Sequence, residues 1–493
     1  MLKSKKIILI NPPWVFAHER DIVLSQNLGI AYLAAFLLKH GHEVSIIDAL
    51  AEGVLNHKKI SAGQQISLQV GLEYESIVKR IPEDTDFIGI SAPFTNNAKI
   101  VKELAHEIKA GFPDKPIILG GVYPSLTPRD AFCADIDYYV VGEGELPLLE
   151  IISGHNPEQI QGVLAYSQPV SRVRRAKIIE NLDDIPYPAR NKLPMHQYLS
   201  FCSPRRDRIR TVSMITSRGC PYDCTFCSIH SITGYTWRKR SSENVLAEIK
   251  LLVEEFKVQH IEFEDDNLTF EKKRMQEIVQ GIIFLNNKGA NISWSAPNGV
   301  RVDTLDEELL EQIKASNCIF LNLAVESGDA DMLKRMNKRL NLSKVLEITR
   351  ICKRLGIKTN AFFMIGYPGE TERSFKKTLN FVKKLKKIGV DEFYATITRA
   401  YPGTKLFDEC KEKGYIADIS AGQHMFLGNE IDKNNAIKTN DFTSRDSLRR
   451  LSLFQRVTVP FYLRWWHKYY YIVKKIIPDA FIQKVKKTLG KQF

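Results

Sequence analysis

Short apolar runs alternate with amphipathic stretches along most of this chain, and this alternation constrains the fold more than any other feature. The first 150 residues contain the runs "KIILINPP", "EVSIID" and "DFIGISAP", with helical patterns between them. Nearly continuous apolar strands joined by helices are typical of a doubly wound parallel sheet, because helices cover both of its faces. We therefore expect an α/β fold that begins with a Rossmann-like parallel sheet.

A second series of strand and helix patterns follows a connector. Residues 151–205 contain an alternating segment that predicts a hairpin and the proline-rich stretch "DDIPYPARNKLP". The next part has six strand–helix units in succession, which predicts a partial (β/α)₆ barrel with its site at the carboxyl ends of the strands. The end of the chain is expected to be helical, basic and aromatic. The predicted domains are residues 1–150, 151–205, 206–408 and 409–493.

Glycine and polar residues follow the predicted strands of the first sheet, where the chain reads "NPPW", "SAPFTN", "GGVYPS" and "GEGE". Ligands bind open parallel sheets at this edge, and glycine lets the backbone approach them closely. An ordinary tight turn would explain any single loop, whereas four at one edge favour a ligand site. No G-x-G-x-x-G follows the first strand, which makes a dinucleotide a poor candidate.

Three cysteines lie close together in "SRGCPYDCTFCSIH", namely Cys220, Cys224 and Cys227. Thiolates at this spacing can hold three irons of a cubic 4Fe–4S cluster and leave the fourth iron open. Zinc with His230 as fourth ligand, or a disulfide, is the weaker alternative. The other cysteines are scattered, so we expect one cluster and otherwise small packed thiols.

The pattern C-x₃-C-x-aromatic-C resembles the motif of the radical S-adenosylmethionine (radical SAM) superfamily. The resemblance covers about residues 210–400, because "FEDDNLTF", "AVESG" and "FFMIGYPGET" follow in the family's order. It implies reductive cleavage of SAM to a 5′-deoxyadenosyl radical that abstracts a substrate hydrogen. No substrate acid or base can be named, since Tyr394 and Tyr401 fit packing equally well. The implied SAM-site residues are Phe226, Asp265, Asp266, Asn267, Glu326 and Gly366.

A doubly wound sheet ahead of such a barrel resembles the cobalamin-binding domain of B12-dependent radical SAM enzymes, over about residues 1–150. The motif Asp-x-His-x-x-Gly, whose histidine ligates cobalt, is missing; this fits cobalamin held without histidine and also a degenerate domain. Methylthiotransferases of transfer RNA use three further N-terminal cysteines, and here only Cys133 is available. The implied cobalamin contacts are Asn11, Pro12, Ser91, Gly120, Gly121, Val122, Gly142, Glu143 and Gly144.

The net charge is +13, and basic residues gather with aromatic ones near the end, in "FYLRWWHKYYYIVKK". Such a segment suits packing on the barrel mouth or contact with an anionic membrane surface; single-stranded nucleic acid is the weakest of the three interpretations. No apolar run reaches the ~20 residues that span a bilayer. The N-terminus runs straight into a strand, without the pattern of a signal peptide. We expect a cytoplasmic protein with peripheral contact at the inner face of the membrane.

These features predict a cobalamin-dependent radical SAM enzyme with one 4Fe–4S cluster, SAM and cobalamin as cofactors. The reaction that we favour is C-methylation of an unactivated carbon in a lipid-like or natural-product substrate. A flavodoxin-type or ferredoxin-type donor would supply electrons. One alternative is radical cyclisation, ring contraction or oxidation without methyl transfer. Another, of a different class, is a non-catalytic iron–sulfur protein that senses cobalamin or redox state.

Overall fold

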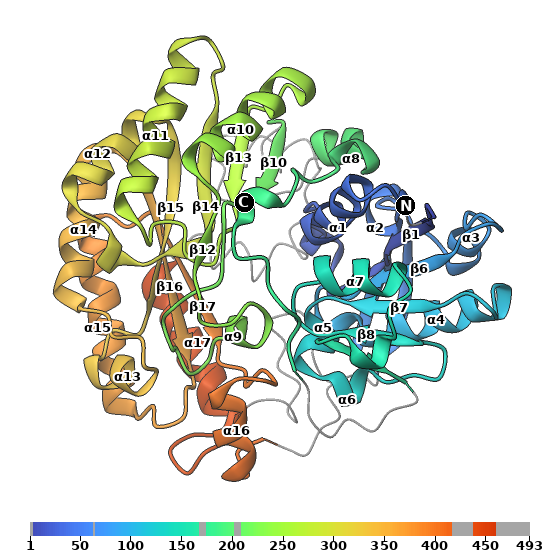
Figure 1. Ribbon diagram of the computed structural model, residues 1–493. Coiled ribbons are helices and arrows are strands. Elements are labelled where there is room, and N and C mark those ends of the chain that lie inside the picture. The colour runs from blue at the N-terminus through green and yellow to red at the C-terminus, as the bar shows by residue number, and fades with distance from the viewer. Residues whose placement is uncertain (1–2, 63–64, 167–173, 202–208, 417–436, 460–493) are drawn as a thin grey trace, which may run out of the picture.

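The computed structural model describes residues 3–62, 65–166, 174–201, 209–416 and 437–459, and its two large sheets lie side by side (Figure 1). The first sheet has the strand order β3-β1-β6-β7-β8-β9. Every pair in it is parallel except β8 with β9. The strands are β1 (Lys6–Asn11), β3 (Glu43–Asp48), β6 (Phe87–Ser91), β7 (Ile117–Gly120), β8 (Tyr138–Val140) and β9 (Val163–Ala165).

Helices cover both faces of this sheet. Successive residues of a strand point to opposite faces, and here apolar residues lie on both faces. Ile7 and Leu9 of β1 share a core with α1 and α7, whereas Ile8 and Ile10 share a core with α4 on the other face. The order of the parallel strands reverses between β1 and β6, which is where such sheets bind ligands. The helices are α1 (Leu28–Lys39), α2 (Ala49–Glu52), α3 (Tyr74–Val78), α4 (Ala98–Gly111), α5 (Val122–Leu126), α6 (Pro128–Ala131) and α7 (Glu145–Ile152).

Two features of the N-terminal part differ from the sequence expectation. Val163–Ala165 pairs antiparallel with β8 and so extends the first sheet, and no partner strand for it occurs among the described residues of the connector. The predicted hairpin in 151–205 stays a prediction, because residues 167–173 of that segment lie outside the described residues. The second feature is a small antiparallel sheet, with β2 (Trp14–Phe16), β4 (His57–Ala62) and β5 (Gln65–Val70) in the order β2-β5-β4.

The second large sheet has the order β10-β13-β14-β15-β16-β17, and all its pairs are parallel. Its strands follow one another around the sheet in chain order, which confirms the predicted partial barrel. The strands are β10 (Thr211–Met214), β13 (His260–Phe263), β14 (Ser293–Val300), β15 (Cys318–Glu326), β16 (Lys358–Ile365) and β17 (Glu392–Ile397). A two-stranded ribbon, β11 (Ser217–Arg218) with β12 (Arg238–Lys239), follows β10.

Helices line the outside of this partial barrel (Figure 1). Ser241 caps the first long helix of the barrel, since its side chain accepts the N–H of Asn244. Among the helices in the described parts of the chain, none combines the length and apolarity needed to cross a bilayer. The helices are α8 (Met195–Ser200), α9 (Ile229–Ile232), α10 (Ser242–Phe256), α11 (Lys272–Asn287), α12 (Glu307–Ala315), α13 (Ala330–Arg335), α14 (Leu342–Leu355), α15 (Glu372–Ile388), α16 (Lys405–Glu412) and α17 (Ser444–Thr458).

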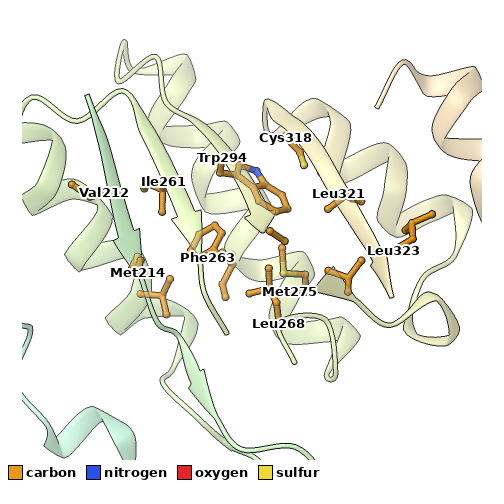
Figure 2. Close-up of a cluster of buried hydrophobic side chains, with 14 of the residues drawn as sticks. Val212, Met214, Ile261, Phe263, Leu268, Met275, Trp294, Cys318, Leu321 and Leu323 are labelled. Carbon is orange, nitrogen blue, oxygen red and sulfur yellow. The ribbon is translucent and has the colours of Figure 1, made fainter. Parts of the chain in front are cut away.

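Apolar side chains on the outer face of the barrel sheet pack against these helices. Figure 2 shows Phe263, Trp294 and Met275 within this core, with the rings of Phe263 and Trp294 edge to face at 5.5 Å. The buried Trp294 indole N–H donates to Ser316 at 2.9 Å, so its polar atom is satisfied. This packing leaves the inner face and the carboxyl ends of the strands for a binding site.

Candidate functional site

The three cysteines lie on the loop that follows β10 and β11, which we call the cluster loop (residues 219–228). Gly219 begins it with φ of +86°, and a Cβ atom there would lie 2.3 Å from the Thr236 carbonyl oxygen. Only glycine fits this conformation and this close backbone approach. The loop therefore turns sharply at Gly219 and places Cys220 immediately beyond the turn.

Hydrogen bonds to other parts of the barrel hold the middle of the cluster loop. The Thr225 N–H donates to the Met336 carbonyl at 3.1 Å, and the Thr225 and Tyr367 hydroxyls are 2.6 Å apart. The Thr225 carbonyl accepts the Leu406 N–H at 2.9 Å. Phe226 packs on the apolar group that includes Met336. The contacts described for Phe226 are packing contacts, and its role toward SAM stays a prediction.

The thiols of the cluster loop are largely withdrawn from water. Burial raises the pKa of Cys220 and Cys224 and raises that of Cys227 to about 12. These thiols are protonated until a metal displaces the proton. The described residues contain no group of three or more histidine, cysteine or acidic side chains arranged around a single ion. A cubic cluster needs no such group, because each thiolate binds a different iron.

His230 is engaged by the protein. Its Nε2 lies 3.2 Å from the Cys220 carbonyl oxygen, and its ring stacks on Tyr235 with the centroids 4.1 Å apart. A cavity of about 210 Å³ opens beside Cys224 and Cys227. Its other lining residues are Arg175, Asp223, His230, Ser231, Tyr235, Gly403, Thr404 and Lys405.

The polar segment after β13 lies directly against the cluster loop. Asp265 accepts hydrogen bonds from the Thr216 N–H and from the Thr216 and Ser217 hydroxyls, the latter two at 2.6 Å. Its carboxylate therefore fixes the chain that leads into the loop. Asp266 accepts the Gly219 N–H at 3.0 Å, and withdrawal from bulk water raises its pKa to about 6.

Asn267 of this segment carries a buried polar atom without a hydrogen-bond partner. Its Nδ2 lies 3.8 Å from the Cys220 sulfur. Its Oδ1 is buried and has no hydrogen-bond partner. Buried polar atoms are normally paired, so an unpaired amide oxygen beside a cluster cysteine fits a donor such as the amino group of SAM.

Glu326 ends β15 at a bulge and has a left-handed backbone, with φ of +66°. Its Oε1 lies 3.0 Å from the Lys338 Nζ in a pair that is almost fully buried. The Lys338 carbonyl accepts a hydrogen bond from Arg301 at 3.1 Å, and the Arg301 guanidinium stacks 3.5 Å from the Tyr222 ring centre. A strained backbone next to buried charge is common at functional sites.

Sequence reasoning missed Lys338 and Arg301. Lys338 lies within "KRMNKRL", where one buried lysine looks like its exposed basic neighbours.

Gly366, at the end of β16, has φ of +74° and donates its N–H to Glu370 at 2.9 Å. A Cβ atom on Gly366 would lie 2.6 Å from the Ser447 hydroxyl of α17. Its implied place in the SAM site stays a prediction.

A polar network connects the ends of β1, β3 and β6. Asn11 donates to Asp48 at 2.7 Å, and Asn27 donates to both Asn11 and Ser91 at 3.0 Å. Tyr198 donates to the other Asp48 oxygen. The side chains of Asn11 and Ser91 are thus engaged within the protein, and Pro12 is buried beside them.

The backbone at the carboxyl edge of the first sheet leaves room for a flat ligand. Gly120 has no heavy atom within 4 Å of where a Cβ would stand, and Gly121, with φ of +109°, leads into α5 at Val122. The buried Trp14 Nε1 and Asn97 Oδ1 near the ends of β1 and β6 lack partners. The open position at Gly120, together with unpaired polar atoms near the strand-order reversal, fits a bound cofactor such as cobalamin.

The loop after β8 contacts the barrel. Glu143 pairs with Arg218 at 3.0 Å and also with Arg238, so both of its oxygens are engaged. A Cβ on Gly144 would lie 3.1 Å from Leu33, and one on Gly142 would lie 3.3 Å from the carbonyl of Ile232. The predicted cobalamin contacts of Glu143 and Gly144 thus compete with protein contacts and stay untested.

Comparison with known proteins agrees with this arrangement. Residues 214–382 match the Radical SAM superfamily, and residues 24–152 match the B12 binding domain. The chain therefore carries a radical SAM domain and a B12-binding domain, which imply a 4Fe–4S cluster, SAM and cobalamin as its cofactors.

Two relatives and one solved structure resemble almost the whole chain. An uncharacterized methyltransferase of Pyrococcus horikoshii is 29% identical over 94% of each chain. The cytidylyl-2-hydroxyethylphosphonate methyltransferase of Streptomyces wedmorensis is 28% identical over 84% of this chain and 83% of its own. The structure of the radical SAM methyltransferase TsrM from Kitasatospora setae, with cobalamin and a [4Fe-4S] cluster bound, superposes with a TM-score of 0.70. It covers 92% of this chain and 91% of that one at 16% identity, which supports the fold.

Proposed function

We propose that this protein is a cobalamin-dependent radical SAM enzyme that methylates an unactivated carbon of a small organic or lipid-like substrate. The observation that carries the proposal is the ion pair between Glu143, at the carboxyl edge of the first sheet, and Arg218, the residue directly before the cluster loop. That contact brings the site for SAM cleavage next to the site for a methyl carrier. The methyltransferase relatives support the reaction class.

The residues that would hold the iron–sulfur cluster are Cys220, Cys224 and Cys227. When bound, the cluster supplies an electron that cleaves SAM, and cobalamin supplies a carrier for the methyl group. Asn267 is suited to accept a hydrogen bond from the amino group of SAM, since its Oδ1 is buried and unpaired. Lys338 and Glu326 are suited to bind the carboxylate and hydroxyl groups of SAM, because both charges lie close enough to Cys224 to act on its thiol. These assignments are proposals.

The inner face of the barrel is the proposed substrate site. Tyr394 of β17 is 51% exposed, and its ring lies edge to face with Phe362 of β16 at 6.0 Å. Neighbouring residues on the other face of β17 pack into the core, so Tyr394 and Phe362 are on the face that the helices leave open. Paired aromatic rings bind apolar parts of a ligand. This favours an organic substrate with apolar surface.

Cluster loading and SAM cleavage test the cofactor half of the proposal. The chain is reconstituted anaerobically with iron and sulfide, then given SAM and dithionite, and 5′-deoxyadenosine is measured. We expect product from the wild type and none from Cys224→Ala. Cys133→Ala is the matched control, because Cys133 lies in the first domain and its thiol contacts Asp135. Cleavage by Cys224→Ala would refute the cysteine assignment, and no cleavage by the fully loaded wild type would favour the non-catalytic sensor.

Methyl transfer is tested separately from radical formation. SAM with a deuterated methyl group is supplied together with a cell extract as a source of substrate. Label in a new product supports C-methylation. An altered product without label would support the alternative, namely cyclisation, ring contraction or oxidation by the same radical.

We further propose, from sequence alone, that the basic aromatic segment in 460–493 gives peripheral contact with an anionic membrane surface and that a flavodoxin-type or ferredoxin-type protein donates electrons. That segment lies outside the described residues. Co-sedimentation with anionic liposomes should fall when 460–493 are deleted. Unchanged co-sedimentation would remove the membrane proposal.

A further inference from the structure

Four charged side chains from the two large domains form a buried group that we call the interface ion network: Glu143, Glu145, Arg218 and Arg238. Arg218 lies 3.0 Å from Glu143 and 2.7 Å from Glu145, and Arg238 is the second partner of Glu143. None of the four side chains is more than 14% exposed. Two carboxylates face two guanidinium groups, so the charge balances within the network.

The network connects the loop after β8 to the start of the cluster loop. Its acids lie in and beside that loop, at the carboxyl edge of the first sheet, and its arginines face each other across the β11–β12 ribbon. Arg218 is followed directly by Gly219 and Cys220. Because a broken pair would leave a charge buried without a partner, movement of the loop after β8 must carry Arg218 with it.

The same loop also lies close to the end of α9, the helix that follows the cluster loop. A Cβ atom on Gly142 would lie 3.3 Å from the carbonyl of Ile232 in α9, the helix that follows Cys227. The Gly142 N–H donates to the Ser125 hydroxyl at 3.0 Å, and this hydroxyl donates to the Gly121 carbonyl at 2.7 Å. Contacts therefore run from the proposed cobalamin edge to the residue before the cluster loop and to the helix after it.

We propose that the interface ion network couples the two cofactor sites, so that cobalamin at the edge of the first sheet and the iron–sulfur cluster on the cluster loop each strengthen binding of the other. Glu145 and Arg218 act as positioning residues, because they touch neither reacting atom. The inference rests on the proposed function, since both groups must bind. Coupling between two sites is reciprocal, so it can be measured from either side.

The wild-type chain provides the first test. Hydroxocobalamin is titrated anaerobically into the chain with and without a reconstituted iron–sulfur cluster, and the dissociation constant is read from absorbance. We expect the cluster to tighten binding at least about fivefold, the lower end of typical coupling. A ratio that stays within about twofold of one would overturn the proposal.

Two variants test the residues. Glu145→Gln removes one charge of the network, and Arg218→Lys keeps the charge but loses the forked geometry that binds two carboxylates. Both should bring the ratio of the two dissociation constants close to one. Glu248→Gln is the matched control, because Glu248 also lies buried between two arginines, Arg190 at 2.6 Å and Arg240 at 2.5 Å, away from the loop after β8. Wild-type coupling retained in Glu145→Gln would contradict the assignment.

A measurement on the wild-type chain tests the proposal even if the variants fail to fold. Hydrogen exchange in the peptide 215–222 should slow when cobalamin is added to the cluster-free chain, and an unchanged rate would overturn the proposal.

The results that would refute this inference differ from those that would refute the proposed function. A chain that binds both groups and cleaves SAM without coupling keeps the function and loses the inference. A chain that binds no cobalamin loses both.

Discussion

At the scale of single residues, the backbone of Gly219 determines how the chain enters the cluster loop. Its φ is +86°, and the space where a Cβ would stand is 2.3 Å from the Thr236 carbonyl. Its N–H also donates to Asp266 at 3.0 Å. A side chain here would cause both left-handed strain and a clash with backbone, which is harder to displace than a side chain.

We predict that Gly219→Ala lowers the free energy of unfolding of the metal-free chain by about 3 kcal/mol or more, from strain plus clash. Gly154 is a matched control, because its φ is +85° and nothing lies within 4 Å of the Cβ position. Gly154→Ala should cost only about 1–2 kcal/mol, the strain alone. Urea unfolding of both variants measures the difference. Equal losses would show that the clash at Gly219 is relieved without cost.

Lys338 allows a second prediction at this scale. Removing its ammonium group leaves the Glu326 carboxylate, 3.0 Å away, buried without its ion partner. We expect Lys338→Met to raise the dissociation constant for SAM about tenfold, equivalent to about 1.4 kcal/mol. Lys377→Met is the control, because Lys377 is 43% exposed in its pairs with Asp329 and Asp331 and such pairs contribute little. SAM affinity unchanged by Lys338→Met would exclude this role.

The residue scale also shows what sequence can reveal about the site. The spacing of Cys220, Cys224 and Cys227 is local, so the candidate ligands could be predicted without a structure. The partners of Glu143 are far away in the chain, at Arg218 and Arg238, and nothing in "GEGE" distinguishes an acid that pairs with arginine from one that meets a ligand. Asp265 likewise looked like a ligand contact, and it supports the chain before the cluster loop.

At the scale of elements, the loop after β8 and the β11–β12 ribbon act as one unit because the interface ion network joins them. Burial alone raises the pKa of Glu145, but Arg218 outweighs burial and brings the pKa below its ordinary value of 4.5. A carboxyl group with a lowered pKa stabilises the fold above its ordinary pKa, and this contribution is lost as the pH falls below that value.

The sign of this effect gives a prediction. Glu145→Gln should lower the free energy of unfolding by about 3 kcal/mol at pH 7, and its difference from the wild type should shrink as the pH falls below about 4.5. Glu370→Gln is the contrast, because burial raises the pKa of Glu370 despite its pair with Arg450. The stability of the wild type relative to Glu370→Gln should decrease as the pH rises above 4.5. Urea unfolding between pH 4 and pH 8 measures both differences in the free energy of unfolding. If the two differences changed with pH in the same direction, the account would be contradicted.

Elements with a strong periodic pattern could be predicted from sequence. The parallel strands of both sheets and the long helices around the barrel form where apolar periodicity places them, because burying one face decides their position. Val163–Ala165 could not be assigned to its sheet, since the choice of β8 as partner depends on a free edge that exists only after folding. The pairing of β2 with β5 likewise joins segments that are distant in the chain.

At the scale of the whole molecule, the carboxyl edge of the first sheet faces the cluster loop of the barrel (Figure 1). An ion pair joins the two domains directly before the cluster loop, and Gly142 lies close to Ile232 at the end of the helix that follows the loop. A continuous apolar core also contains residues of α1, α7 and the barrel strands. This arrangement suits an enzyme that brings a radical and a methyl carrier to one substrate, because the contacts between the domains hold the two sites at a fixed distance from each other.

The most direct test of this central claim follows the two halves of SAM in one experiment. The chain is loaded with iron, sulfide and cobalamin, and is incubated anaerobically with a strong reductant and SAM that carries a deuterated methyl group. The account predicts that 5′-deoxyadenosine forms and that deuterated methyl is recovered in the cobalamin fraction. A fully loaded chain that yields neither product would contradict it.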